Sequence, residues 1–286
     1  MALLRKILVT VDGSEPSLNA LREGCRLARS ERARIVTMTV APPYEGDLNL
    51  VGVRNLHGII NEPCDKGFAA SEKTAREEGV VAQHISTTGE IQKRIVEVAT
   101  EYRCDLIILG YDRRPAVWRV LTSSVVPNVI ASSPIDVLVI PRDTRFDWQT
   151  FLVVLMEPKS AVRSAERALD FARAYGARLL VAVTAAKSSP MRVPPASVLQ
   201  HAFQQCEQAR FLQGLIERAE SVNVRAEPVR LEGRPLPAAI KLAQQERVGL
   251  TILDPEVLAV RRNIFAERYA GLALQRFPSP VLVVHP

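Results

Sequence analysis

The chain has 286 residues, of which 47% are hydrophobic and 5% aromatic, a length that suits two compact domains with a substantial core in each. The net charge of +6 lies entirely in the second half, because residues 1–144 carry 18 basic and 18 acidic side chains and residues 145–286 carry 19 and 13. The basic residues are scattered singly and aromatic residues are few, so we expect no nucleic-acid partner. No run is long and apolar enough to span a membrane. The apolar stretch that follows Arg5 and Lys6 has only five residues, which is too short for the core of a signal peptide.

The cysteines and histidines indicate neither a disulfide framework nor a metal site. The four cysteines form no CxxC pair, and no histidine stands at metal-ligand spacing from another histidine or cysteine. We therefore expect a chain of the reducing cytoplasm, with Cys64 the most exposed thiol. The residues concerned are Cys25, Cys64, Cys104, Cys206, His57, His84, His201 and His285.

In the first half, short Val/Ile/Leu runs alternate with amphipathic segments. The runs are apolar on successive residues, as in strands that are covered on both faces of a parallel sheet. We expect strands near 5–11, 34–40, 81–87, 105–109 and 136–140, with helices between them.

The first helix shows how the amphipathic segments are built. Either Ser14 or Ser17 can cap it, and apolar residues then recur at helical spacing to face the sheet. These positions are Leu18, Leu21, Cys25 and Ala28, and a second copy of the pattern has Val162, Ala165, Leu169 and Ala172.

The whole first half matches the second at a constant offset of 144 residues. Lys-Ile-Leu-Val-Thr-Val at 6–11 aligns with Thr-Phe-Leu-Val-Val-Leu at 150–155, Gly89 aligns with Gly233, and Val-Leu-Val-Ile-Pro at 137–141 aligns with Val-Leu-Val-Val-His at 281–285. The sequence therefore predicts two tandem α/β domains, 1–141 and 150–286, joined by a linker at 142–149.

Ligands of open parallel sheets bind outside the carboxyl ends of the strands, so the informative residues follow strands one and four. Asp12 and Gly13 follow strand one, and strand four ends at Leu109-Gly110. A loop over 111–122 then leads to Ser123-Ser124 and a helix whose first turn contains Pro127. Asp12 is either a ligand contact or a cap of its own turn, and the two serines are phosphate ligands, phosphorylation sites or an N-cap.

The order of elements, Asp12, Gly110 and the closing Val-Leu-Val-Ile-Pro resemble the universal stress protein family, over the whole chain and twice. The resemblance implies two five-stranded parallel sheets with helices on both faces. It also implies that 137–140 pairs with 281–284, which would make the chain an intramolecular pseudo-dimer, either monomeric or further dimerised.

The nucleotide-binding branch of that family carries Gly, two residues, Gly, nine residues, then Gly followed by Ser or Thr. Gly110 and Ser124 match this motif, whereas Arg113 and Ser123 replace its second and third glycines. Trp118 and the paired serines resemble the other branch, which lacks the motif. The resemblance implies a binding set in the first domain of Asp12, Gly13, Val40, Gly110, Arg113, Ser123 and Ser124.

The second copy replaces the key positions, with Met156 for Asp12, Asp254 for Gly110, Val257 for Arg113 and Glu267-Arg268 for the serines. Two acids would repel a phosphate. We expect this domain to keep the fold without the phosphate site.

Three functions remain open from the sequence. The first is a stress-response regulatory protein whose first domain senses ATP or another adenine nucleotide with Mg²⁺ and signals to a protein partner. The second is a weak ATP hydrolase or nucleotidyl enzyme, and the third is a scaffold without a small ligand. No catalytic spacing is present, so binding without turnover is the expectation.

Overall fold

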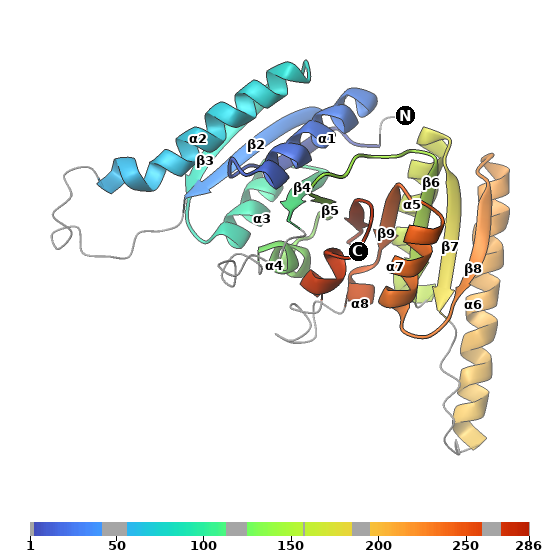
Figure 1. Cartoon of the computed structure of the whole chain (residues 1–286). Helices are drawn as coiled ribbons and strands as arrows, with labels where there is room; N and C mark the ends of the chain where they lie inside the picture. The colour runs from blue at the N-terminus through green and yellow to red at the C-terminus, as the bar shows by residue number, and fades with distance from the viewer. Residues whose placement is uncertain are drawn as a thin grey trace. The chain divides into compact units, whose positions relative to one another are not determined.

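The computed structural model describes residues 3–41, 56–112, 125–156, 158–184, 195–258 and 270–285, with only the backbone described over 56–64, 158–160, 195–206 and at 184. The chain forms two compact units, Met1–Arg145 and Phe146–Pro286. Figure 1 shows the helices and strands of both units.

The first unit is a five-stranded parallel sheet with strand order β3-β2-β1-β4-β5. The strands are β1 (Lys6–Thr10), β2 (Arg34–Ala41), β3 (Ala82–Thr88), β4 (Leu106–Tyr111) and β5 (Asp136–Pro141). The helices are α1 (Glu15–Glu31), α2 (Leu56–Glu77), α3 (Ile91–Glu101) and α4 (Val125–Ser132). All five predicted strands are confirmed, to within two residues at each end.

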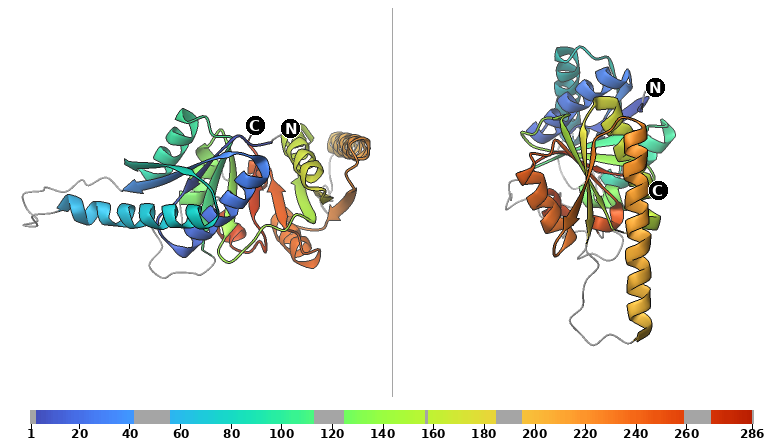
Figure 2. Two further views of the ribbon diagram at one scale, coloured as in Figure 1. Left: turned by 90° about the horizontal axis from the view of Figure 1, so that it is seen from above. Right: turned by 90° about the vertical axis from the view of Figure 1, so that its right-hand side faces the viewer.

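Helices cover both faces of this sheet. Helix α1 packs on β1 and β4 and against α2, while α3 packs against α4 (Figure 2). The central strands are therefore apolar throughout, and Ile7, Leu8 and Val9 of β1 are completely buried. Edge strand β3 instead alternates between more and less exposed residues.

The second unit repeats this topology with strand order β10-β9-β6-β7-β8, all parallel. Its strands are β6 (Thr150–Leu155), β7 (Arg178–Thr184), β8 (Ala226–Leu231), β9 (Leu250–Leu253) and β10 (Val281–Val283). Its helices are α5 (Pro158–Tyr175), α6 (Pro195–Ser221), α7 (Pro235–Gln245) and the single turn α8 (Pro255–Leu258). Figure 1 shows that α6 extends well beyond β8. The predicted pairing of 137–140 with 281–284 concerns the placement of one unit against the other and stays a prediction.

The 144-residue repeat extends to backbone detail. Left-handed residues recur at that offset, with Arg32 (φ 56°) matching Gly176 (φ 66°) and Gly79 (φ 67°) matching Asn223 (φ 59°). Backbone hydrogen bonds recur as well. The amide of Asp105 donates to the carbonyl of Lys6, and that of Gly249 to the carbonyl of Thr150, both at 2.8 Å. The two halves are thus the same fold in spite of their divergent sequences.

One expectation about helix faces is wrong in both units. Leu18 is only half-buried and Val162, its equivalent, is 45% exposed, although both were expected to face the sheet. The preceding residues, Ser17 and Ala161, are the buried ones. Each helical residue turns the side chain by about 100°, so positions 18 and 162 lie at the rim of the buried stripe. The spacing identified the buried face but not its centre.

A group of aromatic rings stands at the beginning of the second unit. Trp148 lies between Phe146 and Tyr175, with ring centroids 4.7 and 4.0 Å away and nearly parallel planes. Phe171 of α5 extends the group beyond Tyr175, and the guanidinium of Arg167 lies 5.5 Å from the Phe171 centroid. In the first unit the equivalent of Tyr175 is Glu31, whose carboxylate accepts a 2.7 Å hydrogen bond from the Leu3 amide. The two units therefore hold the segment before their first strand by different means.

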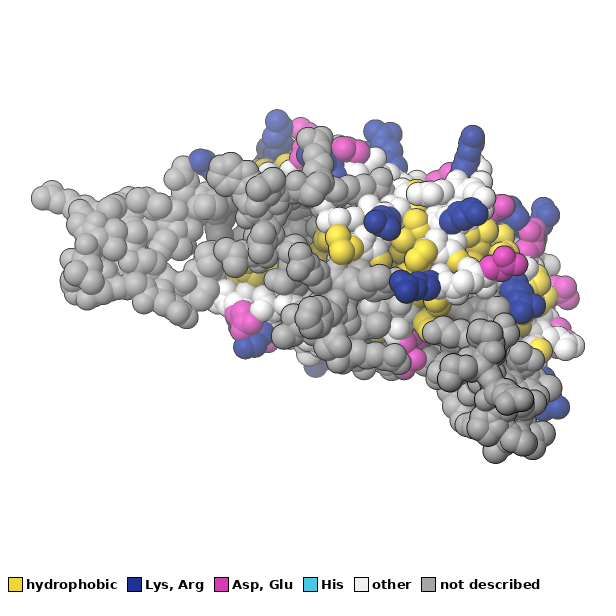
Figure 3. All heavy atoms as spheres, turned by 60° about the horizontal axis from the view of Figure 1, so that its bottom comes forward, with side chains coloured by type: hydrophobic (Ala, Val, Ile, Leu, Met, Phe, Trp, Pro, Cys, Tyr) yellow, Lys and Arg dark blue, Asp and Glu magenta, His cyan; other side chains and the backbone are white. Residues whose placement is uncertain are grey.

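Surface charge in the described part of the chain is mixed. Figure 3 shows Lys and Arg side chains interspersed with Asp and Glu on the face drawn. Among the described helices, none is long and apolar enough to cross a membrane. Cys25 and Cys104 are buried free thiols, and burial raises their pKa values to about 12 and about 11. The expected exposure of Cys64 falls on a side chain outside the described residues.

Candidate functional site

The candidate site is the carboxyl edge of the first unit's sheet, where the turn after β1 carries Asp12 and Gly13. Ser14 begins α1 as its N-cap, with its hydroxyl accepting a 3.5 Å hydrogen bond from the Ser17 amide. The Ser17 hydroxyl in turn donates to the Ser14 carbonyl (2.9 Å) and accepts from the Asp12 amide (3.3 Å). Both serines left open by the sequence therefore take part, but Ser14 is the cap.

Asp12 combines the two roles that the sequence left open. Its Oδ1 accepts a 2.9 Å hydrogen bond from the Ser14 amide, which fixes the turn, while the residue as a whole stays exposed. Neighbouring protein atoms remove part of the hydration of the carboxylate and so raise its pKa. The hydrogen bonds from Ser14, Ser17 and the backbone outweigh this effect and hold the pKa below its ordinary value of 3.8. Asp12 is thus an ionised, accessible acceptor at neutral pH.

Val40 lies near the end of β2, level with Asp12. The β1–β2 register pairs Thr10 with Met38, and continued by two residues it sets Asp12 beside Val40. The carbonyl of Met38 accepts from the Val11 amide on the β1 side, whereas that of Ala41 accepts from the Gly89 amide on the β3 side. Because peptide groups alternate along a strand, those of Val40 face the β1 side, beyond the last residue of that strand.

Gly110 is placed differently from the expectation. Strand β4 continues through it to Tyr111 rather than ending there. A Cβ atom on Gly110 would stand 2.5 Å from the Pro16 carbonyl carbon and 2.7 Å from the Ser17 nitrogen. The glycine therefore permits the close approach of α1, in addition to the approach to a bound group that the sequence led us to expect. At the equivalent position of the second unit, Asp254 bears a side chain, and β9 ends one residue before it.

Helix α2 also reaches the site, through a glycine inside the helix. A Cβ on Gly67 would contact the Asp12 carbonyl carbon, the Gly13 nitrogen and Thr39 Cγ2, each at 3.4 Å. Gly13 has a left-handed φ of 78°, which a side chain would disfavour. The α2 backbone therefore covers one side of the Asp12–Gly13 turn.

The comparisons with known proteins agree with this architecture. The model of the universal stress protein family matches residues 4–141. A universal stress protein A homolog from Haemophilus ducreyi is 30% identical over 145 residues, covering 49% of this chain and 97% of that protein, and a universal stress protein from Methanocaldococcus jannaschii is 29% identical over 147 residues, covering 49% and 84%. The chain belongs to the universal stress protein family.

Solved structures of the family extend the likeness to both units. The crystal structure of a universal stress protein from Archaeoglobus fulgidus has a TM-score of 0.71 at 16% identity, and covers 98% of this chain and 96% of its own. At that identity the likeness concerns the fold alone. This universal stress protein is therefore of the two-domain form, as the internal repeat predicts.

Of the predicted site residues, the structure places four on one edge of the sheet: Asp12, Gly13, Val40 and Gly110. Arg113, Ser123 and Ser124, together with Trp118, lie outside the described residues. The sequence reasoning missed the parts that Ser17 and Gly67 play around the turn. A glycine in the middle of an amphipathic helix, such as Gly67, is the signal that could have found one of them.

The second unit differs at the same edge. Asp254 is buried, and its Oδ1 accepts a 2.9 Å hydrogen bond from the Glu256 amide, so that it caps α8. Asp254 thus places a carboxylate at the position of Gly110, and this carboxylate accepts a hydrogen bond from the backbone. The chemical environment there differs from that around Asp12. No group of three potential metal-binding side chains occurs among the described residues of either unit.

Proposed function

We propose that the first unit binds an adenine nucleotide at the carboxyl edge of its sheet and that the protein acts in stress-response regulation by binding. The observation that carries this proposal is the ionised carboxylate of Asp12, an exposed residue that Ser14 holds in the turn that follows β1. An open parallel sheet binds its ligands at this edge.

The chemistry of Asp12 assigns it a part of the ligand. A carboxylate accepts hydrogen bonds from hydroxyl and amino groups, and it repels a phosphate unless a cation lies between them. Asp12 would therefore accept from a ribose hydroxyl or an adenine amino group, or hold Mg²⁺. The Val40 peptide, which faces the same side, supplies both a donor and an acceptor for the base.

The phosphates would lie toward the start of α4, where the sequence carries Ser123 and Ser124. Backbone amides at a helix start favour anions. Arg113, which the sequence places in the loop before these serines, has a guanidinium that can pair with a phosphate in place of the missing motif glycine. The second unit has neither the aspartate nor the serines, and we propose that it carries no phosphate site.

The test is isothermal titration calorimetry and thermal unfolding of the full chain with ATP, ADP, AMP and adenosine, each with Mg²⁺ and with EDTA. The variant is Asp12→Asn, which keeps the shape and removes the charge. Loss of a hydrogen bond to a charged group costs about 1.5–3 kcal/mol, so its affinity should fall roughly 10- to 100-fold. The matched control is Glu101→Gln, which removes an exposed carboxylate at the end of α3.

Each outcome decides between the functions. Binding by the wild type and by Glu101→Gln, with loss in Asp12→Asn, supports the proposal. If Asp12→Asn binds the nucleotide with the same affinity as the wild type, the nucleotide does not contact Asp12 and the proposed site is wrong. Sustained Mg²⁺-dependent phosphate release would favour a hydrolase, and absence of binding by every nucleotide would favour a scaffold for a protein partner.

A further inference from the structure

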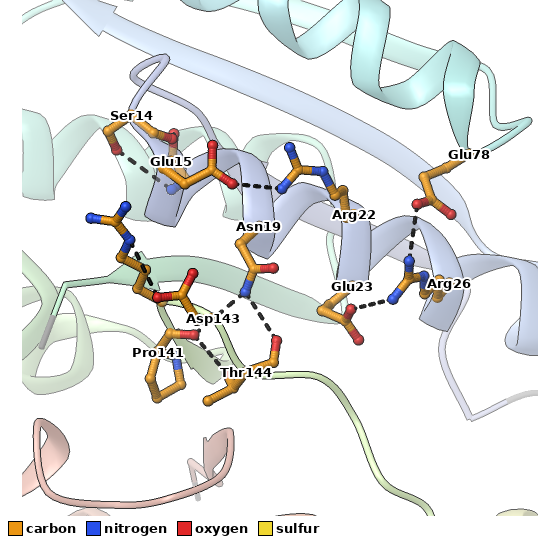
Figure 4. Close-up of polar contacts among 12 residues, drawn as sticks. Ser14, Glu15, Asn19, Arg22, Glu23, Arg26, Glu78, Pro141, Asp143 and Thr144 are labelled. Carbon is orange, nitrogen blue, oxygen red and sulfur yellow. Dashed lines mark hydrogen bonds and ion pairs between the residues drawn. The ribbon is translucent and has the colours of Figure 1, made fainter.

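Asn19 of α1 makes a long-range contact that the proposed site does not use. Its side-chain Nδ2 donates to the carbonyl oxygens of Pro141, at 3.4 Å, and Thr144, at 3.0 Å (Figure 4). These residues are more than 120 positions away in the chain. The amide of Asn19 thus ties the second turn of α1 to the segment that follows β5.

The segment that Asn19 holds is a tight turn. The Thr144 amide donates to the Pro141 carbonyl at 3.2 Å, and the Thr144 hydroxyl donates to the same oxygen at 2.6 Å. Asp143 between them is left-handed, with φ 60°, and Thr144 is buried. The next residue, Arg145, is the last of the first unit, so this turn sets the path by which the chain leaves it.

The same helix end is built into the candidate site. Ser17, two residues before Asn19, holds the Asp12 amide, and the Pro16–Ser17 peptide lies tightly against Gly110. An α-helix moves as a rigid element over so short a distance. A shift of the Asp12 turn therefore displaces the Asn19 amide, whose two acceptors belong to the exit turn.

We propose that Asn19 is a positioning residue that couples ligand binding at Asp12 to the exit turn at 141–145, through the first two turns of α1. The proposal rests on the proposed nucleotide site and adds how its occupancy is transmitted along the chain. The coupling belongs to the first unit, because the equivalent of Asn19 in the second unit is Arg163, an exposed residue of α5.

The experiment measures hydrogen exchange of the backbone amides of residues 142–145 in the full chain, with and without ATP and Mg²⁺. In the wild type, binding should slow exchange at Thr144 by roughly fivefold or more, the size of a typical coupling between sites. In Asn19→Ala the nucleotide should still bind, with this protection lost. Arg163→Ala, the matched control, should behave as the wild type. Equal protection of Thr144 in Asn19→Ala, or none in the ligand-bound wild type, would overturn the coupling.

A second readout needs no ligand, so it separates failure of the coupling from failure of the nucleotide site. The carboxyl pKa of Asp12, followed by NMR, reports the hydrogen bonds from Ser14 and Ser17. Release of α1 should raise this pKa toward 3.8 in Asn19→Ala and leave it unchanged in Arg163→Ala. A residue that only stabilises the fold would lower the melting temperature without moving the pKa, and that result would contradict the role given to Asn19.

Discussion

Gly110 of β4 lies so close to the backbone nitrogen of Ser17 in α1 that a methyl group on the glycine would stand 2.7 Å from that atom. Side-chain carbons do not approach backbone atoms this closely, and backbone cannot move aside as a flexible side chain can. The contact fixes the distance between α1 and the sheet at the candidate site. Strand β4 and the Asp12 turn are therefore parts of one rigid arrangement.

Gly110→Ala should consequently destabilise the first unit and disturb the Asp12 turn. Overpacking of this kind costs about 1–3 kcal/mol of unfolding free energy, to be measured by urea unfolding. Gly214→Ala is the control, because nothing lies within 4 Å of a Cβ at that exposed position of α6. It should be neutral or stabilising by up to about 1 kcal/mol. Equal stability of the two variants would show that α1 can move away from β4 at little cost.

Most of the fold could be predicted from the sequence, because the pattern of apolar residues reports burial directly. Runs such as Ile7–Val9 are apolar on both strand faces, and the constant offset of 144 carried the assignment into the second half. The prediction failed where the spacing of apolar residues does not tell which of them lies at the centre of the buried helix face. Leu18 and Val162 share the helical spacing of the buried residues but sit at the rim of the stripe.

The candidate site was predicted less completely, since a motif names residues without naming their contacts. Asp12 was identified, and its capping and ligand-facing roles turned out to be compatible. Gly110 was identified as a residue that lets backbone approach a bound group, and the structure adds its contact with α1, which only the folded chain brings about. Contacts between distant segments, such as that of Asn19 with Thr144, leave no local pattern in the sequence.

The repeat offers a stability test at the carboxyl ends of α1 and α5. Arg32 and Gly176 are equivalent, both exposed and both left-handed, but only glycine adopts this conformation without a steric cost. Arg32→Gly should therefore stabilise the protein, and Gly176→Arg should destabilise it, each by about 1 kcal/mol. Differential scanning calorimetry of the two variants checks the opposite signs. Shifts of the same sign would mean that the contacts of the arginine outweigh its backbone strain.

The aromatic group of the second unit should contribute to stability through Trp148, whose ring lies between two others. Trp148→Ala is expected to cost about 3 kcal/mol by urea unfolding, at the low end for a tryptophan truncation because the residue is half-exposed. A double-mutant cycle with Tyr175→Ala should give a coupling of about 0.5–1.5 kcal/mol, as stacked rings do. Phe146→Ala, which removes one of the two rings stacked on Trp148 and leaves the other in place, should cost less. A cycle energy near zero would show that the rings contribute only through their burial.

His84 lies on edge strand β3. Its Nδ1 lies 3.0 Å from the Thr37 hydroxyl and its Nε2 3.3 Å from the Thr39 hydroxyl, and Phe68 of α2 covers the ring with centroids 4.4 Å apart. Removal from water disfavours the charged imidazolium and lowers the pKa of His84 below 6.5. As the pH falls below about 6.5, the unfolded chain therefore takes up a proton before the folded chain does, and stability declines until the lower folded pKa is passed.

Urea unfolding between pH 7.5 and 5.0 should accordingly show a steeper loss of stability in the wild type than in His84→Gln, which cannot titrate. The contributions of His57, His201 and His285 are common to both proteins and cancel in the difference. NMR titration of the His84 ring provides the folded pKa independently, and its distance from 6.5 sets the size of the expected difference. Parallel stability curves for the two proteins would mean that solvent reaches the ring through the open edge of β3 and leaves its protonation unaffected by folding. His84 and Gly67 both lie against Thr39. A difference between the two stability curves would therefore also show that a titrating group lies in the packing between α2 and the Asp12–Gly13 turn.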